Sequence, residues 1–205
     1  MIDTKELRCT IGCLGPSLPW IAALLLWEIP ESISATYYEA RTIAPFMIIL
    51  GAASFFLIWY KGYDKQDDII NTIAGIFGFI ICLFPCQNNT MELVGTFQIP
   101  QHISAIIHNV SAAIFFGLLA YNSFFLFTKH GEHMTAEKKK RNVVYRVCGV
   151  GMVASFAILL LPWFRIQIWL VETISLSCFG LSFLTKADFI PWLFADKKEG
   201  QHHEN

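Results

Sequence analysis

The chain is poor in charged residues. Only 15% of its 205 residues are Asp, Glu, Lys or Arg, whereas a soluble domain carries about a quarter. The two signs nearly cancel, giving a net charge of -1, so no basic excess indicates a nucleic-acid partner. Hydrophobic residues make up 55% of the chain and the mean hydropathy is +0.50. This composition excludes an ordinary soluble domain and predicts a multi-pass integral membrane protein.

The sequence also lacks the common catalytic motifs. It has no phosphate-binding glycine loop, no Ser elbow and no nucleic-acid signature. The "HGEH" segment, residues 130–133, has its two His residues three apart around Gly131, whereas a metalloprotease helix needs them four apart. The six Cys residues show no metal-ligand spacing. We therefore predict no metal and no cofactor.

The apolar residues occur in blocks of roughly twenty, the length that crosses a bilayer. Each block is apolar on all sides, which suits burial in lipid or in a helix bundle. The predicted fold is an all-α, six-helix transmembrane bundle without a soluble domain, a single domain over residues 1–205 with an interfacial or cytoplasmic tail at 186–205. The predicted spans are about 10–29, 43–60, 69–86, 103–127, 146–161 and 166–185.

The first span has an alternative interpretation. Its charged start, apolar middle and small residues near Ser34 and Ala35 also fit a signal peptide cleaved there. The long apolar run with Pro16 and Pro19 favours a retained helix.

Lys and Arg residues predict the orientation of the bundle. Of the 15, 13 lie at the two termini, in the second-to-third connection and in the fourth-to-fifth connection. Only Arg41 and Arg165 lie in the connections on the other side. Positive residues concentrate on the cytoplasmic side of membrane proteins. Both termini are therefore predicted to be cytoplasmic, and the loop "PESISATYYEART", residues 30–42, to face outward.

Two ionisable residues lie inside predicted spans, where a charge is expensive and usually paired or functional. His108 is about 9 Å and Glu172 about 10 Å below the outer surface, at about 1.5 Å of helix rise per residue. Each shares a helix face with Ser residues, Ser104 and Ser111 in one span, Ser175 and Ser182 in the other. We predict that His108 and Glu172 pair directly or through one water. A purely structural clasp between the helices is the alternative.

The outward loop brings further polar residues to the same level. Tyr residues also favour the membrane interface, so an ordinary interfacial belt is the alternative. A concave polar mouth at helix ends is a typical ligand site. The predicted ligand-binding residues are Ser32, Ser34, Tyr37, Tyr38, Glu39, Arg41, His102, His108 and Glu172.

Small residues mark the third span. Gly75 and Gly78 lie on one face of it and predict close helix packing. Cys82 and Cys86, four apart near its outer end, are predicted to be buried packing residues. Binding of a ligand or pairing with another Cys is the alternative.

The order of these elements resembles the Frag1/DRAM/Sfk1 family of membrane proteins. The similarity rests on "PESISATYYEART", "AGIFGFIICLFPC", "HNVSAAIFFGLLAY", "KKRNVVYRVCGVGM" and "WLVETISLSCFGLSFL", and covers most of the chain. The matched positions are Ser32, Ser34, His108 and Glu172. The resemblance implies a role in lipid-linked membrane biology. Membrane ceramidase-like zinc hydrolases fit less well, because they need a His pair four apart in a late span.

Three functions follow as hypotheses. The first is a non-catalytic protein that binds membrane lipid, a membrane-protein partner or a second copy of itself at the outward pocket. The second is a lipid-modifying enzyme with His108 as general acid or base and Glu172 orienting it. The third is a small transporter or channel that uses the same pair as a proton relay.

Overall fold

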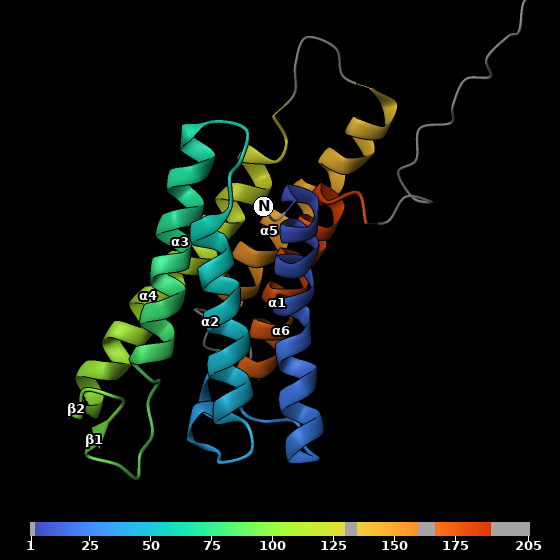
Figure 1. The fold of residues 1–205 in the computed structure, drawn as a ribbon. Helices are drawn as coiled ribbons and strands as arrows, with labels where there is room; N and C mark the ends of the chain where they lie inside the picture. Colours follow the sequence, from blue (N-terminus) through green and yellow to red (C-terminus); the bar gives the residue numbers. More distant parts are fainter. Residues whose placement is uncertain (1–2, 130–134, 160–166, 190–205) are drawn as a thin grey trace, which may run out of the picture.

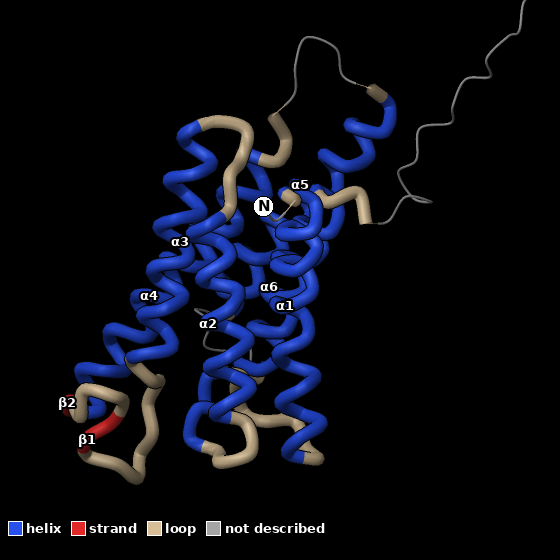
Figure 2. The backbone as a smooth tube through the Cα atoms, in the orientation of Figure 1, coloured by secondary structure: helices blue, strands red, loops and turns tan. Residues whose placement is uncertain are grey.

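A computed structural model describes residues 3–129, 135–159 and 167–189 (Figures 1 and 2). Most of these residues are helical, and the others lie in the connections. The α-helices are α1 (Thr4–Leu26), α2 (Ile43–Trp59), α3 (Lys65–Leu83), α4 (Gln101–Tyr121), α5 (Ala136–Ile158) and α6 (Ile168–Lys186).

Four short elements join or extend the helices. They are the 3-10 turn η1 (Ser34–Tyr38), the π-helical turn η2 (Asn122–Leu126), and the strands β1 (Leu93–Val94) and β2 (Ile99–Pro100). The strands pair antiparallel, with Leu93 opposite Pro100. Gly95 after β1 has a φ of 72°, which glycine adopts without steric strain. This hairpin was not predicted, because each strand has only two residues.

Side-chain caps start several helices earlier than the apolar pattern indicates. The carboxylate of Asp64 accepts the amide N–H groups of Gln66 and Asp67, and Thr135 Oγ1 accepts that of Lys138. Such caps satisfy the first amides of a helix. The basic stretch "AEKKKR" therefore forms the first turns of α5, which begins at Ala136. The helix thus begins ten residues before the span predicted at about 146–161, since helical backbone continues beyond the apolar residues.

The six helices run alternately up and down (Figure 1). Each packs against the next along the chain, and α6 closes the ring by packing against α1. We call the end with η1, the hairpin and the starts of α4 and α6 the loop end. The opposite end, with the starts of α1, α3 and α5, we call the basic end.

Glycines let the helices approach closely. A Cβ at Gly75 would lie 2.7 Å from Ile58 Cγ1 and collide with the Ser54 carbonyl oxygen, and one at Gly78 would collide with Ser54 Oγ. The predicted packing role of these two glycines, against α2, is therefore confirmed. Gly180 of α6 has the same role against α1, where a Cβ would lie 2.5 Å from the Gly12 carbonyl oxygen.

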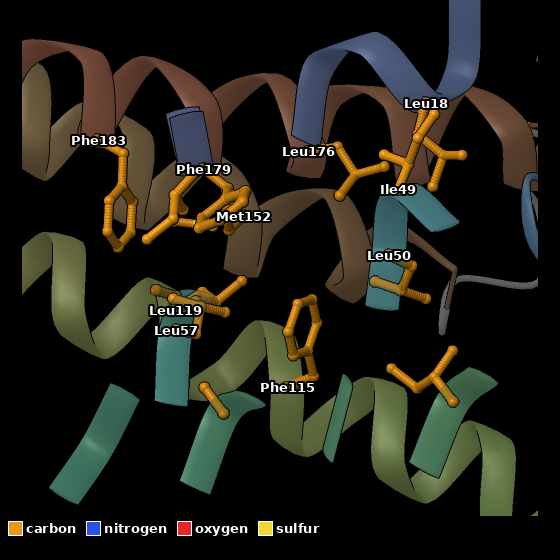
Figure 3. Close-up of a cluster of buried hydrophobic side chains, with 14 of the residues drawn as sticks. Leu18, Ile49, Leu50, Leu57, Phe115, Leu119, Met152, Leu176, Phe179 and Phe183 are labelled. Atoms are coloured by element: carbon orange, nitrogen blue, oxygen red, sulfur yellow. The ribbon is translucent and has the colours of Figure 1, made fainter. Parts of the chain in front are cut away.

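Apolar side chains from α1, α2, α4, α5 and α6 meet in the middle of the ring. Figure 3 shows Leu57, Phe115, Phe179 and Phe183 in this cluster. Each is no more than 2% exposed. Phe179 and Phe183 contact one another edge to face, with ring centroids 5.0 Å apart, a favourable arrangement for aromatic rings.

Among the described residues, α1, α3, α6 and the continuous α4–η2 helix are long and apolar enough to cross a membrane. Helix α2 is apolar but has only 17 residues, about 25 Å of helix against a hydrocarbon core of about 30 Å. Helix α5 begins with charged residues from Glu137 to Arg141. The all-α class is thus confirmed and four of the described helices could cross a membrane, whereas the six-span membrane bundle stays a prediction.

An ion cluster joins α3 to the segment after α4 at the basic end. Lys129 Nζ lies 2.8 Å from Asp64 Oδ2 and 2.9 Å from Asp67 Oδ1. The hydrogen bond from Lys129 lowers the pKa of Asp64, helped by the amides of Asp67 and Gln66.

This lowered pKa predicts acid sensitivity at the basic end. A carboxylate with a depressed pKa stabilises the fold above its unfolded pKa of about 3.9, and this contribution is lost as the pH falls through the folded pKa. We expect Asp64→Asn to lower the thermal unfolding temperature at about pH 6 and to lower it less at about pH 3. Thermal unfolding in detergent across this range measures it. An equal effect at both pH values would contradict the expectation.

Candidate functional site

The candidate site lies at the loop end, where η1 meets α4 and α6. Ser34 Oγ is 2.9 Å from Glu172 Oε1 and 3.1 Å from His108 Nε2. Three residues far apart in the sequence therefore meet at one hydroxyl group. The predicted proximity of His108 and Glu172 is found, but the group between them is the Ser34 side chain rather than a direct bond or a water. We call these three residues the Ser34 network.

Glu172 holds the loop of residues 30–42 against α6. Its Oε2 accepts the amide N–H of Ile33 at 2.5 Å, while Oε1 accepts the Ser34 hydroxyl. One turn earlier, the amide of Trp169 donates to the carbonyl of Glu31 at 3.0 Å. Because α6 starts at Ile168, its first amides have no partner within the helix. The loop backbone supplies one such partner.

His108 joins α4 to the end of α3. Its side chain is 3% exposed, and Nδ1 lies 2.8 Å from the Phe84 carbonyl oxygen. One turn earlier on α4, the Ser104 hydroxyl donates to the Pro85 carbonyl at 2.8 Å. A carbonyl oxygen can only accept, so Nδ1 carries a proton. The other ring nitrogen, Nε2, is the one that faces Ser34.

Counting hydrogens limits the protonation states of the Ser34 network. The Ser34 hydroxyl has one proton but contacts both Glu172 and His108 Nε2. With Nδ1 protonated, both contacts are hydrogen bonds only if His108 is an imidazolium donating to Ser34, or if Glu172 is a carboxylic acid donating to Ser34. Both arrangements hold the same number of protons. They differ by the transfer of protons along the Glu172–Ser34–His108 chain.

The remaining loop residues hold the backbone of η1 in place. Ser32 Oγ accepts the amide of Ala35 at 2.9 Å, and Thr42 Oγ1 donates to the Thr36 carbonyl at 2.8 Å. Thr36 is buried, at 1% exposed. Ser32 therefore supports the site through the turn and does not contact the Ser34 network.

The two Tyr residues attach the loop to its neighbours. The Tyr38 hydroxyl donates to the Cys86 carbonyl at 2.6 Å. Burial, followed by the neighbouring thiol of Cys86, raises the pKa of Tyr38 to about 12, so this donor stays protonated at physiological pH. Tyr37 packs edge to face against Tyr38 and Phe46.

Three of the predicted ligand residues take no part in the Ser34 network or in the contacts that support it. Glu39, Arg41 and His102 are exposed, and within the described ranges their side chains make no hydrogen bond or ion pair with one another or with the Ser34 network. Their exposure leaves them available at the loop end.

Several partners at the site could not be identified from the sequence. The carbonyls of Phe84 and Pro85 and the amide of Ile33 are backbone groups, and residue identity does not reveal their direction. One feature of the sequence did indicate free backbone carbonyls at this position. Pro85 follows α3 closely, and the residue before a proline leaves the helical conformation, which frees carbonyls for side-chain partners.

Other polar residues of the two predicted stripes bind different elements. Ser175 Oγ lies 2.6 Å from Ser155 Oγ of α5, and Ser182 Oγ lies 2.6 Å from Ser123 Oγ of η2. Only Glu172 of its stripe reaches the loop. These serines are therefore contacts between helices, and the polar stripe is not one continuous site.

An unpartnered donor lies one turn from Glu172 on α6. The indole N–H of Trp169 is buried without a hydrogen-bond partner in the described structure. Trp169 and Glu172 are three residues apart on α6, so they share one face of the helix. A buried donor without an acceptor is costly and marks a position where an external acceptor would be favourable.

The cysteines near the site are free thiols. Cys82 is buried and Cys86 half-buried, consistent with the predicted packing role. In the part of the chain that the structure describes, no three His, Cys, Asp or Glu side chains are grouped to hold a metal ion. The "HGEH" segment, Arg165 and most of the tail predicted at 186–205 lie outside the described residues.

The Ser34 network can bind an anion, transfer a proton or activate a hydroxyl group. The Frag1/DRAM/Sfk1 resemblance stays a prediction. No protein-family model matches the chain, and neither the curated proteins nor the solved structures include a significant match.

Proposed function

We propose that the chain is a multi-pass membrane protein of the Frag1/DRAM/Sfk1 type that binds the anionic headgroup of a membrane lipid at the loop end. The observation that carries the proposal is the set of donors around the Glu172 carboxylate. The Ile33 amide and the Ser34 hydroxyl both donate to it. Phosphate oxygens accept the same kinds of hydrogen bond as carboxylate oxygens. The Glu172 carboxylate thus occupies a position whose hydrogen-bond donors would also suit a phosphate group.

The surroundings support entry of a ligand from outside the bundle. Ser34 and Glu172 are only half-buried, and the Trp169 indole offers a further N–H that has no partner among the described residues. When the Glu172 side chain turns away, this position loses its internal anion and keeps the Ile33 amide and the Ser34 hydroxyl as donors. A headgroup phosphate then replaces the carboxylate, with its acyl chains in the bilayer.

The test is binding of a fluorescent phosphatidic acid to the purified chain in neutral detergent, with phosphatidylcholine as the comparison lipid. Glu172→Gln removes the competing negative charge, so we expect tighter binding of phosphatidic acid. Ser34→Ala removes a donor and is expected to weaken it. Ser155→Ala is the matched control, because its hydroxyl bonds within the bundle to Ser175. Weaker binding by Glu172→Gln, or equal binding by all variants, would contradict the proposal.

Proton transfer is a second candidate function, favoured by the hydrogen count in the Ser34 network. Its two fully bonded states differ only by movement of protons between Glu172 and His108 through Ser34. In liposomes with an internal pH dye, a relay would make proton flux depend on Glu172, and Glu172→Gln would stop it. Lipid binding without flux separates the first function from this one.

A lipid-modifying enzyme is less well supported. Ser34 Oγ is within hydrogen-bond reach of the base His108, which the Phe84 carbonyl orients, and this resembles an activated nucleophile. However, the amides of Ile33 and Ala35 already donate to Glu172 and Ser32. They are therefore not free to stabilise an oxyanion. Release of product from purified lipids would favour the enzyme.

We also propose that the basic end faces the cytoplasm, on the distribution of Lys and Arg. In a background without native Cys, exposed Ala40→Cys at the loop end is expected to react with an impermeant thiol reagent added to intact cells. Exposed Lys140→Cys at the start of α5 is expected to react only after permeabilisation. The reverse pattern would overturn the orientation. Labelling of denatured protein controls for thiol content.

A further inference from the structure

The structure has a second candidate site, an apolar groove between α4 and α5 on the outside of the bundle. Its volume is about 460 Å³, within the range of about 300–1,000 Å³ typical of ligand pockets. Its lining includes Gly117, Tyr121 and Phe124 from α4 and η2, and Gly149, Val150 and Val153 from α5. Its walls offer almost no polar atoms, so the groove fits a hydrocarbon chain.

The groove exists because two glycines act differently. A Cβ at Gly149 would lie 2.8 Å from Phe124 Cβ and 3.1 Å from the Ala120 carbonyl oxygen, so this glycine lets the helices touch. A Cβ at Gly117 would meet no atom within 4 Å. The helices are therefore in contact at Gly149, while the surface beside Gly117 remains hollow.

The π-helical turn shapes the end of the groove nearer the basic end. In η2, the amide of Phe127 bonds to the Asn122 carbonyl at 2.9 Å, one residue further along the chain than in an α-helix. Asn122 and Ser123 point into the bundle, where they bond to Asn71 and to Ser182. Phe125 remains 54% exposed beside the groove. π-Helical turns of this kind frequently occur at functional sites.

Arg146 provides a positive charge at the end of the groove nearer the basic end. Arg146 is exposed and has no ion-pair partner among the described side chains. It precedes Gly149 by three residues and Val150 by four, so it lies on the same face of α5. A flexible Arg side chain can place its charge in the headgroup layer while its stem follows the apolar surface. The groove thus combines a hydrocarbon channel with a cation at one end.

We propose that this groove binds one anionic phospholipid, with an acyl chain along Gly117 and the phosphate on Arg146. The charge argues against a second copy of the chain as occupant. In a two-fold dimer within one membrane, equivalent residues lie at equal depth, so the two Arg146 side chains would approach each other. An anionic lipid instead neutralises Arg146. This site is separate from the Ser34 network and lies toward the opposite end of the bundle.

Native mass spectrometry of the full chain in neutral detergent tests the proposal, with phosphatidylglycerol and phosphatidylcholine as probes. Arg146→Gln is expected to weaken phosphatidylglycerol binding about fivefold, equivalent to about 1 kcal/mol per basic residue at a charged lipid surface. It should leave phosphatidylcholine binding unchanged. Gly117→Leu adds a side chain whose Cβ meets no atom within 4 Å and whose remaining atoms occupy groove volume, so it should reduce the number of retained lipids by one for both probes.

Two variants serve as matched controls. Lys65→Gln removes an exposed positive charge at the same end of the bundle but on α3. Gly51→Leu adds the same side chain on α2, where a Cβ has its nearest neighbour, Phe79, at 3.9 Å. Both should bind lipid like the unmodified chain. Equal losses in the controls, or no loss in Arg146→Gln and Gly117→Leu, would overturn the proposal. A dimer that Gly117→Leu dissociates would assign the groove to a second copy instead.

Discussion

Replacing Glu172 with Ala is expected to destabilise the chain by about 2–5 kcal/mol, because two donors lose their acceptor and each unpaired buried group costs about 1–3 kcal/mol. These donors are the Ile33 amide and the Ser34 hydroxyl. Without the acceptor, the loop of residues 30–42 separates more easily from α6. SDS-induced unfolding in mixed micelles measures the change.

Two comparison variants make this expectation specific. In Glu172→Gln the amide oxygen still accepts one hydrogen bond, so the expected loss is only about 1–2 kcal/mol, while any function that needs the charge disappears. Glu39→Ala removes an exposed acid from the same loop and should change stability by less than about 0.5 kcal/mol. Equal stability of Glu172→Ala and Glu39→Ala would show that the Ser34 network does not hold the loop.

Gly180→Val is expected to destabilise the bundle by about 3 kcal/mol or more, the upper range for overpacking a tight interior. A Cβ at Gly180 would lie 2.5 Å from the Gly12 carbonyl oxygen and would collide with the Pro16 ring. Neither neighbour can move aside as a flexible side chain does, because one is backbone and the other a ring within α1. Helices α1 and α6 would therefore have to separate, which opens the ring.

The control for this variant is Gly117→Ala, a glycine substitution with open space around it. Since no atom lies within 4 Å of the added Cβ, we expect no loss, and a gain of up to about 1 kcal/mol from helix propensity. Unfolding in mixed micelles again gives the values. Similar destabilisation by both substitutions would indicate a general effect of side chains at helix glycines, not close packing of α1 on α6.

Part of the candidate site could be predicted because depth in a helix depends only on residue count. His108 and Glu172 were expected at a common level, and both reach the Ser34 hydroxyl. Ser34 itself was predicted as a ligand residue, but not as the link between the pair. Its position depends on the path of η1. Two hydrogen bonds set this path, one from the Thr42 hydroxyl to the Thr36 carbonyl and one from the Trp169 amide to the Glu31 carbonyl. No periodic pattern encodes such a path.

The sequence by itself determined the helical class and the positions of the helices. Long apolar blocks must satisfy their backbone groups internally when water is absent, and the helix does this with local bonds alone. The segregation of Lys and Arg likewise follows from residue type and position. These properties are local, so they can be read along the chain.

Only the tertiary structure decided which helices touch and where space remains between them. Gly117 and Gly149 are the same residue type in neighbouring helices, yet one borders a hollow and the other a close contact. In the same way, the Phe84 carbonyl became the partner of His108 through the course of the chain after α3. The physical reason is that packing and backbone direction depend on residues distant in sequence, which act together only once the ring of helices has closed.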